Sequence, residues 1–190
     1  MKKIFLVIAF ISAGLITGAQ AKFGAKAGLN LADWSGSDAD ETKMKIGFHL
    51  GGFVNLAVSE TFSVQPELLF SNQGTKFETE EGSATYHTNY LNIPVMAQYT
   101  TASGFYAETG PYAGFLLSAK IKSDGQSADV KELFKSADFG WGLGLGYKLS
   151  SGLGFGARYN FGLAKLPEEG DAKLNNSVIH IGLSYTFGGK

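Results

Sequence analysis

The 190-residue chain contains no cysteine, so it has neither a disulfide framework nor thiolate chemistry. Proline is scarce at 4 residues, and the 26 glycines are spread through strand-like segments, which argues against a low-complexity linker. After the N-terminal region, no apolar run reaches the roughly 18 residues of a membrane-spanning helix. The charge balance has no basic surplus, so a nucleic-acid partner is not expected.

The N-terminus has the three parts of a secretory signal peptide. Lys2 and Lys3 form a positive region, residues 4–16 form a 13-residue apolar region, and an Ala-Gln-Ala cleavage site follows. The apolar region is short for a spanning helix, which needs about 20 residues. We therefore predict a signal peptide over residues 1–21 and one domain over residues 22–190, with an uncleaved anchor as the alternative. Without the two lysines, 14 basic and 17 acidic side chains remain, a net charge of −3.

Large apolar residues alternate with small or polar ones through the mature chain. In the string FGWGLGLGYKL, Phe139, Trp141 and Leu143 share one face with further apolar residues, and the other face is almost entirely glycine. A glycine face is too small for a solvated surface and suits the inside of a narrow barrel, whereas the apolar face suits lipid. Eight such segments are predicted as strands, namely residues 22–32, 44–57, 61–73, 86–99, 105–119, 139–149, 153–164 and 177–187.

The connections between these segments alternate in length. Long connections cover residues 33–43, 74–85, 120–137 and 165–176, and short ones cover residues 58–60, 100–104 and 150–152. Outer-membrane barrels have short periplasmic turns, longer outward loops and an even number of strands. The sequence therefore predicts an all-β, eight-stranded, antiparallel up-and-down transmembrane β-barrel in the cell outer membrane, with both termini periplasmic.

A soluble lipocalin-like barrel is the structural alternative. It is also exported and antiparallel, but it turns apolar residues inward around a ligand and charged residues outward. That arrangement would place Phe139 and Trp141 inside and leave an outer surface of glycine, serine and asparagine. A water-facing surface so poor in lysine and glutamate disfavours this interpretation.

Several strings carry a resemblance to a known family: KFGAKAGLNLA, FSVQPELLFSNQG, NYLNIPVMAQY, FYAETGPYAGFLLSAK and GWGLGLGYKLSSGLGFGARYNFGL. Together they resemble the PorT-like outer-membrane β-barrel family over essentially the whole mature chain. The resemblance implies an eight-stranded barrel in a Gram-negative outer membrane. The family's namesake is linked to protein secretion, and no motif here transfers that role. The tail departs from many barrels, because Phe187 is not terminal but is followed by Gly-Gly-Lys.

Strand alternation also places a set of polar residues inside the barrel. We predict that they form a hydrogen-bonded ionic network that fills the interior, because an unpaired buried charge is costly. A metal or acid–base site that uses His49, His180 and Glu67 is one alternative, and a narrow ion path is another. No cofactor is expected. The predicted interior residues are Lys26, His49, Glu67, Glu108, Arg158 and His180.

The predicted function is a structural scaffold that presents outward loops for adhesion or for a secretion or envelope partner, in contact with outer-membrane lipid and lipopolysaccharide. A lipid-modifying enzyme, such as a lipid A deacylase or palmitoyl transferase, is the alternative. Its catalytic residues would lie at the loop-side rim or on the lipid face, where His87 is the one candidate histidine and no Ser/His pair is found.

The long connections are rich in acidic residues. A calcium site in DWSGSDADE fails because no glycine stands where an EF-hand needs its sharp turn. Mobile, solvated loops are therefore expected, and residues 120–135, which include VKELFK, are predicted to form a short amphipathic helix at the membrane surface. The loop acids are Asp33, Asp38, Asp40, Glu41, Glu78, Glu80, Glu81, Glu168, Glu169 and Asp171.

Overall fold

The computed structural model describes residues 21–39, 42–79, 82–123, 125–170 and 172–188. The predicted signal peptide lies outside these residues except for its last residue, Ala21, which is the first residue of a strand. Among the described residues, no helix has both the length and the apolar character needed to cross a membrane.

The described chain forms one antiparallel sheet that closes on itself. Two short strands, β4 (Thr75–Thr79) and β7 (Gln126–Asp129), and a 3₁₀ helix, η1 (Lys131–Leu133), lie in the long connections. Eight long strands form the wall within the described residues: β1 (Ala21–Ser35), β2 (Thr42–Ala57), β3 (Phe62–Gln73), β5 (Gly82–Thr100), β6 (Phe105–Ser123), β8 (Ala137–Lys148), β9 (Leu153–Gly162) and β10 (Asn175–Thr186).

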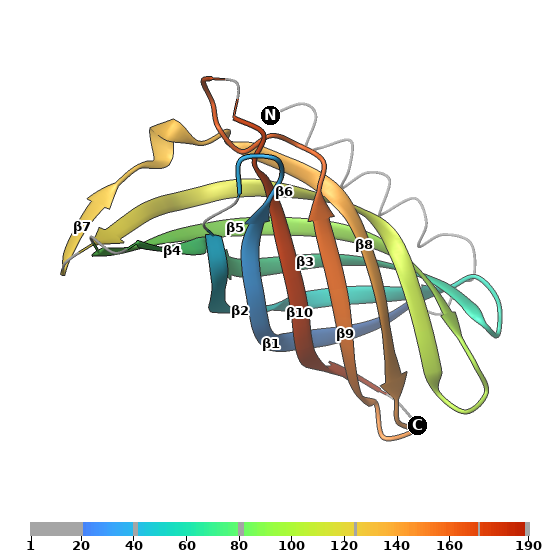
Figure 1. Ribbon diagram of the computed structural model, residues 1–190. Coiled ribbons are helices and arrows are strands. Elements are labelled where there is room, and N and C mark those ends of the chain that lie inside the picture. Colours follow the sequence, from blue (N-terminus) through green and yellow to red (C-terminus); the bar gives the residue numbers. More distant parts are fainter. Residues whose placement is uncertain (1–20, 40–41, 80–81, 124, 171, 189–190) are drawn as a thin grey trace.

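Each long strand pairs with the next long strand along the chain, and β1 pairs with β10 to complete the ring. The closing register runs from Gly24↔Thr186 to Ser35↔Asn175. Closure leaves no unpaired strand edge in the wall, which lipid could not satisfy. Figure 1 shows the tilted strands of the ring, with the C-terminal end beside the short turns. The predicted all-β, eight-stranded, up-and-down barrel is confirmed.

The alternation in sequence becomes an outer apolar face and an inner polar face. On β8, Phe139, Leu143 and Leu145 are 56%, 53% and 57% exposed on the outside of the wall. The lipocalin-like alternative is therefore wrong, because it requires these side chains to be buried inside the barrel. An outer surface of this kind is what a lipid environment stabilises.

The glycines of β8 and β9 make room for tyrosines that come from β6. Tyr106 and Tyr112 point into the barrel and are nearly buried. A Cβ atom at Gly146 would lie 2.6 Å from the Tyr106 hydroxyl oxygen, and one at Gly140 would lie 2.6 Å from the Tyr112 ring. The nearly bare face of the sequence is thus covered by aromatic rings from the neighbouring strand.

The two ends of the barrel differ as the connection lengths predict. The turns at residues 58–61, 101–104 and 149–152 are short, whereas the opposite end carries the long connections (Figure 1). Part of these connections is strand: β5 begins at Gly82, and β6 continues to Ser123. In Figure 1, β4 and β7 lie at the far ends of these two strands.

The predicted amphipathic helix in residues 120–135 is wrong. Strand β6 continues through Lys120, and β7 pairs back on it with Lys120↔Asp129 and Ser123↔Gln126. Only one 3₁₀ turn, η1, forms in the described part of this segment, and none of its residues is buried. The hairpin satisfies the backbone groups through the ladder with β6, an alternative that helical periodicity alone cannot reveal.

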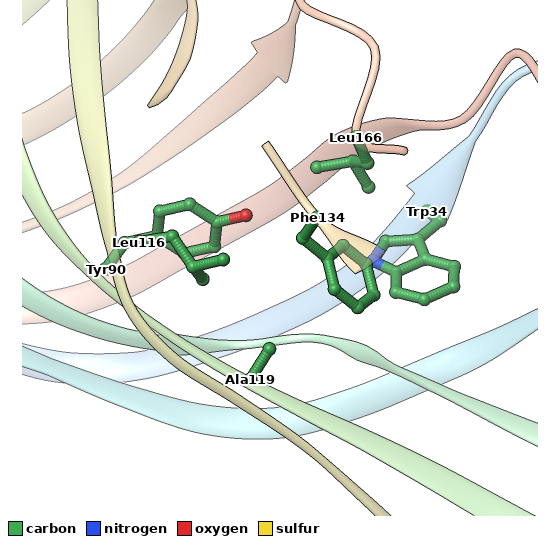
Figure 2. Close-up of a cluster of buried hydrophobic side chains, with 6 residues drawn as sticks. All are labelled: Trp34, Tyr90, Leu116, Ala119, Phe134 and Leu166. Atoms are coloured by element: carbon green, nitrogen blue, oxygen red, sulfur yellow. The ribbon is translucent and has the colours of Figure 1, made fainter. Parts of the chain in front are cut away.

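A hydrophobic cluster covers the interior at the long-connection end. We call it the aromatic cover, and Figure 2 shows its six buried side chains. Its ring contacts include Trp34–Phe134, with centroids 5.6 Å apart. Phe134 and Leu166 belong to two different long connections, so the cover ties these connections together. Its members are Trp34, Tyr90, Leu116, Ala119, Phe134 and Leu166.

Candidate functional site

Arg158 is the centre of an ionic network inside the barrel. From β9, its Nη1 and Nη2 atoms donate to the two carboxylate oxygens of Glu67 at 2.9 and 2.7 Å. Its Nε atom donates to Oε1 of Glu108 at 2.6 Å. The guanidinium therefore bridges two carboxylates, from strands β3 and β6, and its contact with Glu67 is bidentate, the geometry in which arginine binds a carboxylate most strongly.

Lys26 from β1 completes the charge balance of this network. Its Nζ atom donates to Glu67 Oε1 at 2.8 Å, and Gln65 donates to the same oxygen at 2.9 Å. The side chains of Glu67, Glu108 and Arg158 are 0%, 3% and 5% exposed. Two positive and two negative groups thus neutralise one another, which a buried cluster of charges requires. We call Lys26, Glu67, Glu108 and Arg158 the ionic network.

A chain of amides extends the ionic network toward the short-turn end. Gln98 donates to Glu108 at 2.8 Å, and its Oε1 accepts from Lys148 Nζ at 2.7 Å. Asn55 donates to the same Gln98 oxygen at 3.2 Å. The Lys148 ammonium also lies 5.1 Å from the centroid of the Tyr106 ring. Hydrogen-bonded side chains therefore fill the interior toward the short-turn end, and they leave no open channel among the described residues there.

His49 and His180 form a separate pair that makes no hydrogen bond with the ionic network. Their Nδ1 atoms lie 3.3 Å apart, and the rings meet edge to face. The Asn30 amide nitrogen donates to the Phe48 and Asn72 carbonyl oxygens, so its Oδ1 atom is the acceptor for the His49 Nδ1 proton, at 2.7 Å. That bond fixes the tautomer of His49.

The histidines and Glu67 are not brought together as a set of ligands. Glu67 bonds Arg158 and Lys26, whereas His180 contacts His49 and the Asn160 amide at 3.1 Å. Within the described residues, no group of three or more histidine, cysteine or acidic side chains has the arrangement of a metal site. The alternative that uses His49, His180 and Glu67 together therefore has no geometric support.

Asp138 on β8 is a buried acid that was not among the predicted interior residues. Its Oδ2 atom accepts from Asn176 at 2.9 Å and from the Tyr112 hydroxyl at 3.3 Å, and Oδ1 has no partner among the described residues. No described lysine, arginine or histidine forms an ion pair with it. The predicted strand began at Phe139, so extending the alternation by one residue would have placed Asp138 with the inward glycines.

The interior leaves little free space. A cavity of about 30 Å³ beside Lys26, His49 and Arg158 is of the size that one or two waters occupy. A wider hollow of about 330 Å³ lies at the short-turn end, between Lys22, Asn55 and Lys148. The ionic network stands above this hollow and the aromatic cover closes the other end, so the described interior is filled across the ring.

His87 does not form a catalytic pair in the described part of the chain. It lies on β5 opposite Lys120 of β6, near the long-connection end. No hydroxyl of the described residues forms a hydrogen bond with its ring, whereas a nucleophile and its base stand within hydrogen-bond reach of each other. The geometry at His87 therefore gives no support to the enzyme alternative.

Two of the predicted loop acids have defined partners. Asp33, near the end of β1, accepts a hydrogen bond of 2.6 Å from the Thr75 hydroxyl. The Asp38 carboxylate accepts a hydrogen bond of 2.8 Å from the backbone N–H of Lys173, in a different long connection. This bond, together with one from the Ser37 hydroxyl, lowers the pKa of Asp38 below its usual range. The contact joins the connection after β1 to the connection before β10.

Comparison with known proteins agrees with the barrel. Residues 18–167 match the family described as the outer membrane protein beta-barrel domain, and the chain belongs to that family. The match is to this broad family, so the finer PorT-like resemblance remains a prediction. No curated protein sequence matches the chain significantly.

Two solved barrels show the same fold at low sequence identity. Neisserial surface protein A is 15% identical with a TM-score of 0.55, and the comparison covers 88% of this chain and 99% of that chain. Ail, the attachment invasion locus protein of Yersinia pestis, in complex with the heparin analogue sucrose octasulfate, is 16% identical with a TM-score of 0.54, with the same coverage of both chains. These likenesses are of fold alone.

Proposed function

We propose that this chain is a closed outer-membrane scaffold that presents its long connections to the outside of the cell, for adhesion or for an envelope or secretion partner. In this proposal the short turns and both termini face the periplasm, and the N-terminal 21 residues direct export. The observation that supports it most is the ionic network, because it draws side chains from four strands across the middle of the barrel. A role at the cell surface is in keeping with the name of Ail, the attachment invasion locus protein, whose fold this chain shares.

The closed interior is tested by conductance across a planar lipid bilayer. The folded barrel should insert without discrete channel openings, because Arg158 bridges Glu67 and Glu108 across the ring and the aromatic cover closes the outer end. A known porin inserted under the same conditions is the positive control. Reproducible unitary currents from the folded chain would contradict a closed scaffold and favour the narrow ion path.

The role of the long connections is tested by shortening one of them without disturbing the wall. In the connection before β10, the Leu166 N–H bonds the Leu174 carbonyl at 2.8 Å, so a tight turn can replace residues 167–173 at this neck. Cells that display this variant should lose adhesion or partner crosslinking. The matched control replaces residues 167–173 with a Gly/Ser segment of the same length, so that the side chains of the connection change while its length does not. Unchanged adhesion for every shortened connection would refute the scaffold proposal.

A further inference from the structure

The outer face of β5 and β6 changes from apolar to basic near the long-connection end. On β6, Phe115 and Leu117 are 42% and 47% exposed, and the outward residues that follow are Ser118, Lys120 and Lys122. Both lysines are exposed. The strand therefore leaves its apolar section and presents positive charge within a few residues.

The strand register places basic residues of three strands on one face. Lys76 of β4 lies opposite Thr85 of β5, which lies opposite Lys122 of β6. One step of the pleat nearer the apolar section, His87 lies opposite Lys120. Directly paired residues, and residues two apart on a strand, share a face. We call Lys76, His87, Lys120 and Lys122 the basic patch.

The basic patch is on the outside of the wall. The alternate positions on β4 and β5 carry Phe77 and Tyr86, and both rings pack against Trp34 of the aromatic cover, at 5.8 and 4.9 Å between centroids. Since neighbouring residues of a strand point to opposite faces, Lys76 and His87 point away from the cover. The hairpin of β4 and β5 thus packs against the aromatic cover with its inner face and carries positive charge on its outer face.

The depth of the basic patch corresponds to the lipid headgroups. Outward apolar residues of β6 extend from Phe105 to Leu117, which at about 3.3 Å per residue and a tilt of about 40° is roughly 30 Å. That height matches the apolar band of an outer-membrane barrel, about 25 Å tall. Lys120 and Lys122 follow directly beyond this band, where the phosphates of the outer leaflet lie.

A row of hydrogen-bonded polar side chains separates the apolar section from the basic patch. Asn72 donates to Asn89 at 2.7 Å, and Asn89 donates to Ser118 at 2.9 Å. Asn89 stands two residues from His87, and Ser118 two residues from Lys120, so the row shares their outward face. Because these polar groups satisfy one another, they suit the boundary between the acyl chains and the headgroups.

The charges of the basic patch are not neutralised by ion pairs among the described residues. None of Lys76, Lys120 and Lys122 forms a described salt bridge, although Asp129 of β7 stands opposite Lys120 in the ladder. Neighbouring strands are about 4.8 Å apart, so the backbones of Lys76 and Lys122 lie roughly 10 Å apart across β5. Flexible lysine side chains at that spacing can converge on one phosphate.

We propose that Lys76, Lys120 and Lys122 form a binding site for the phosphorylated headgroup of an outer-leaflet lipid, such as the phosphate of lipid A. The site rests on the proposed function only in that the long-connection end faces outward. Asn89 and Ser118 provide polar neighbours for the sugar below the phosphate, and Phe115 and Leu117 contact the acyl chains. The connection between β9 and β10 is unlike this site, because Lys165 and Lys173 there are interspersed with acidic residues.

The test compares two triple variants of the full mature chain. The variant K76Q/K120Q/K122Q removes the three charges of the site, and K22Q/K165Q/K173Q removes three exposed lysines in other parts of the barrel. Each folded barrel is titrated in detergent with bisphosphorylated lipid A, and the bound lipid is counted by native mass spectrometry. At about 1 kcal/mol for each lysine near a lipid surface, the site variant should bind about 100-fold more weakly, and the control variant should bind as the parent does.

The source of the phosphate is resolved by two further ligands. Lipid A without its phosphates, and inorganic phosphate alone, should each bind far more weakly than bisphosphorylated lipid A. Equal binding by the site variant and the parent, equal loss in both variants, or equal binding of the dephosphorylated lipid would each overturn the proposal. Heat-dependent migration on an SDS gel confirms that both variants are folded. Channel openings in the bilayer experiment would refute the closed scaffold while leaving the lipid site standing, so the two failures are distinguishable.

Discussion

Replacing Arg158 with methionine should destabilise the barrel strongly. Methionine keeps much of the length and apolar volume of the side chain but removes three charge-assisted hydrogen bonds, two to Glu67 and one to Glu108. Glu67 would retain Lys26 at 2.8 Å, whereas Glu108 would retain only the neutral Gln98 amide. The variant therefore leaves one buried carboxylate without a cation in hydrogen-bond contact.

The size of the effect follows from the burial of the partners. The Glu67 and Glu108 side chains are 0% and 3% exposed, so water cannot replace the lost guanidinium. Removing one member of a buried ion pair costs about 3–5 kcal/mol, and we expect R158M to lose about 4 kcal/mol of the free energy of unfolding. The double variant R158M/E108Q removes the orphaned charge as well and should recover about half of that loss.

The assay is urea-induced unfolding in lipid vesicles, followed by the mobility of unheated samples on SDS gels. Folded and unfolded barrels migrate differently, so the gel gives the folded fraction at each urea concentration. E108Q alone is the control, because it keeps the bidentate contact between Arg158 and Glu67. A free energy of unfolding for R158M within about 1 kcal/mol of the parent, or a double variant no more stable than R158M, would contradict a structural role for the buried ion pairs of Arg158.

Three further predictions test other parts of the structure. Asp138→Asn should leave stability unchanged or raise it in the same assay, because Asp138 has no cation partner among the described residues; a loss comparable to that of R158M would contradict this. Leu143→Arg, at a position 53% exposed on the lipid face, should cost about 2–4 kcal/mol in vesicles, and Leu143→Phe should cost little. The pKa of Asp38 is lowered in the folded state, so its bond to the Lys173 amide contributes stability above the ordinary pKa and loses it as pH falls through the lowered pKa; an NMR titration in which the Lys173 amide shift follows an unperturbed carboxyl would disprove the contact.

The strands of the wall could be predicted from the sequence because apolar residues on one face alternate with glycine or polar residues on the other, with a period of two residues. Phe139, Leu143 and Leu145 could be assigned to the outside from their alternation with glycine alone. The register of the closing pair, Gly24↔Thr186, could not be assigned, since it depends on two segments at opposite ends of the chain. Alternation fixes the face of a residue but not its partner.

The long connections were less predictable for a physical reason. Residues 82–85, Gly-Ser-Ala-Thr, have no apolar alternation, and they are strand because β4 and β6 pair with them. The segment with VKELFK has some helical periodicity, but its flanking residues form the hairpin of β6 and β7. In both places pairing with a neighbour decides the backbone conformation, and a single segment does not contain that information.

Strand alternation was enough to predict that the six polar residues point inward, but it did not predict which of them contact one another. The structure separates His49 and His180 from the four charged residues of the ionic network. Strand tilt and stagger decide which inward residues meet at the same height, and those quantities come from the whole barrel. For the same reason Lys148 and Gln98, which alternation also places on the inward face, were not predicted as members of the polar network.

The distribution of the ionic network around the ring links membrane insertion to correct closure. The ionic network takes one residue from each of four strands, and no two of these strands are neighbours in the ring. The residues are Lys26 of β1, Glu67 of β3, Glu108 of β6 and Arg158 of β9. An open or misregistered sheet would carry these charges into the bilayer without partners, at a cost that opposes insertion. Neutralisation becomes complete only when the first and last strands have joined. The closed barrel is thus the arrangement in which all four charges have their partners, so its energy in the membrane is lower than that of a sheet in which these contacts are missing.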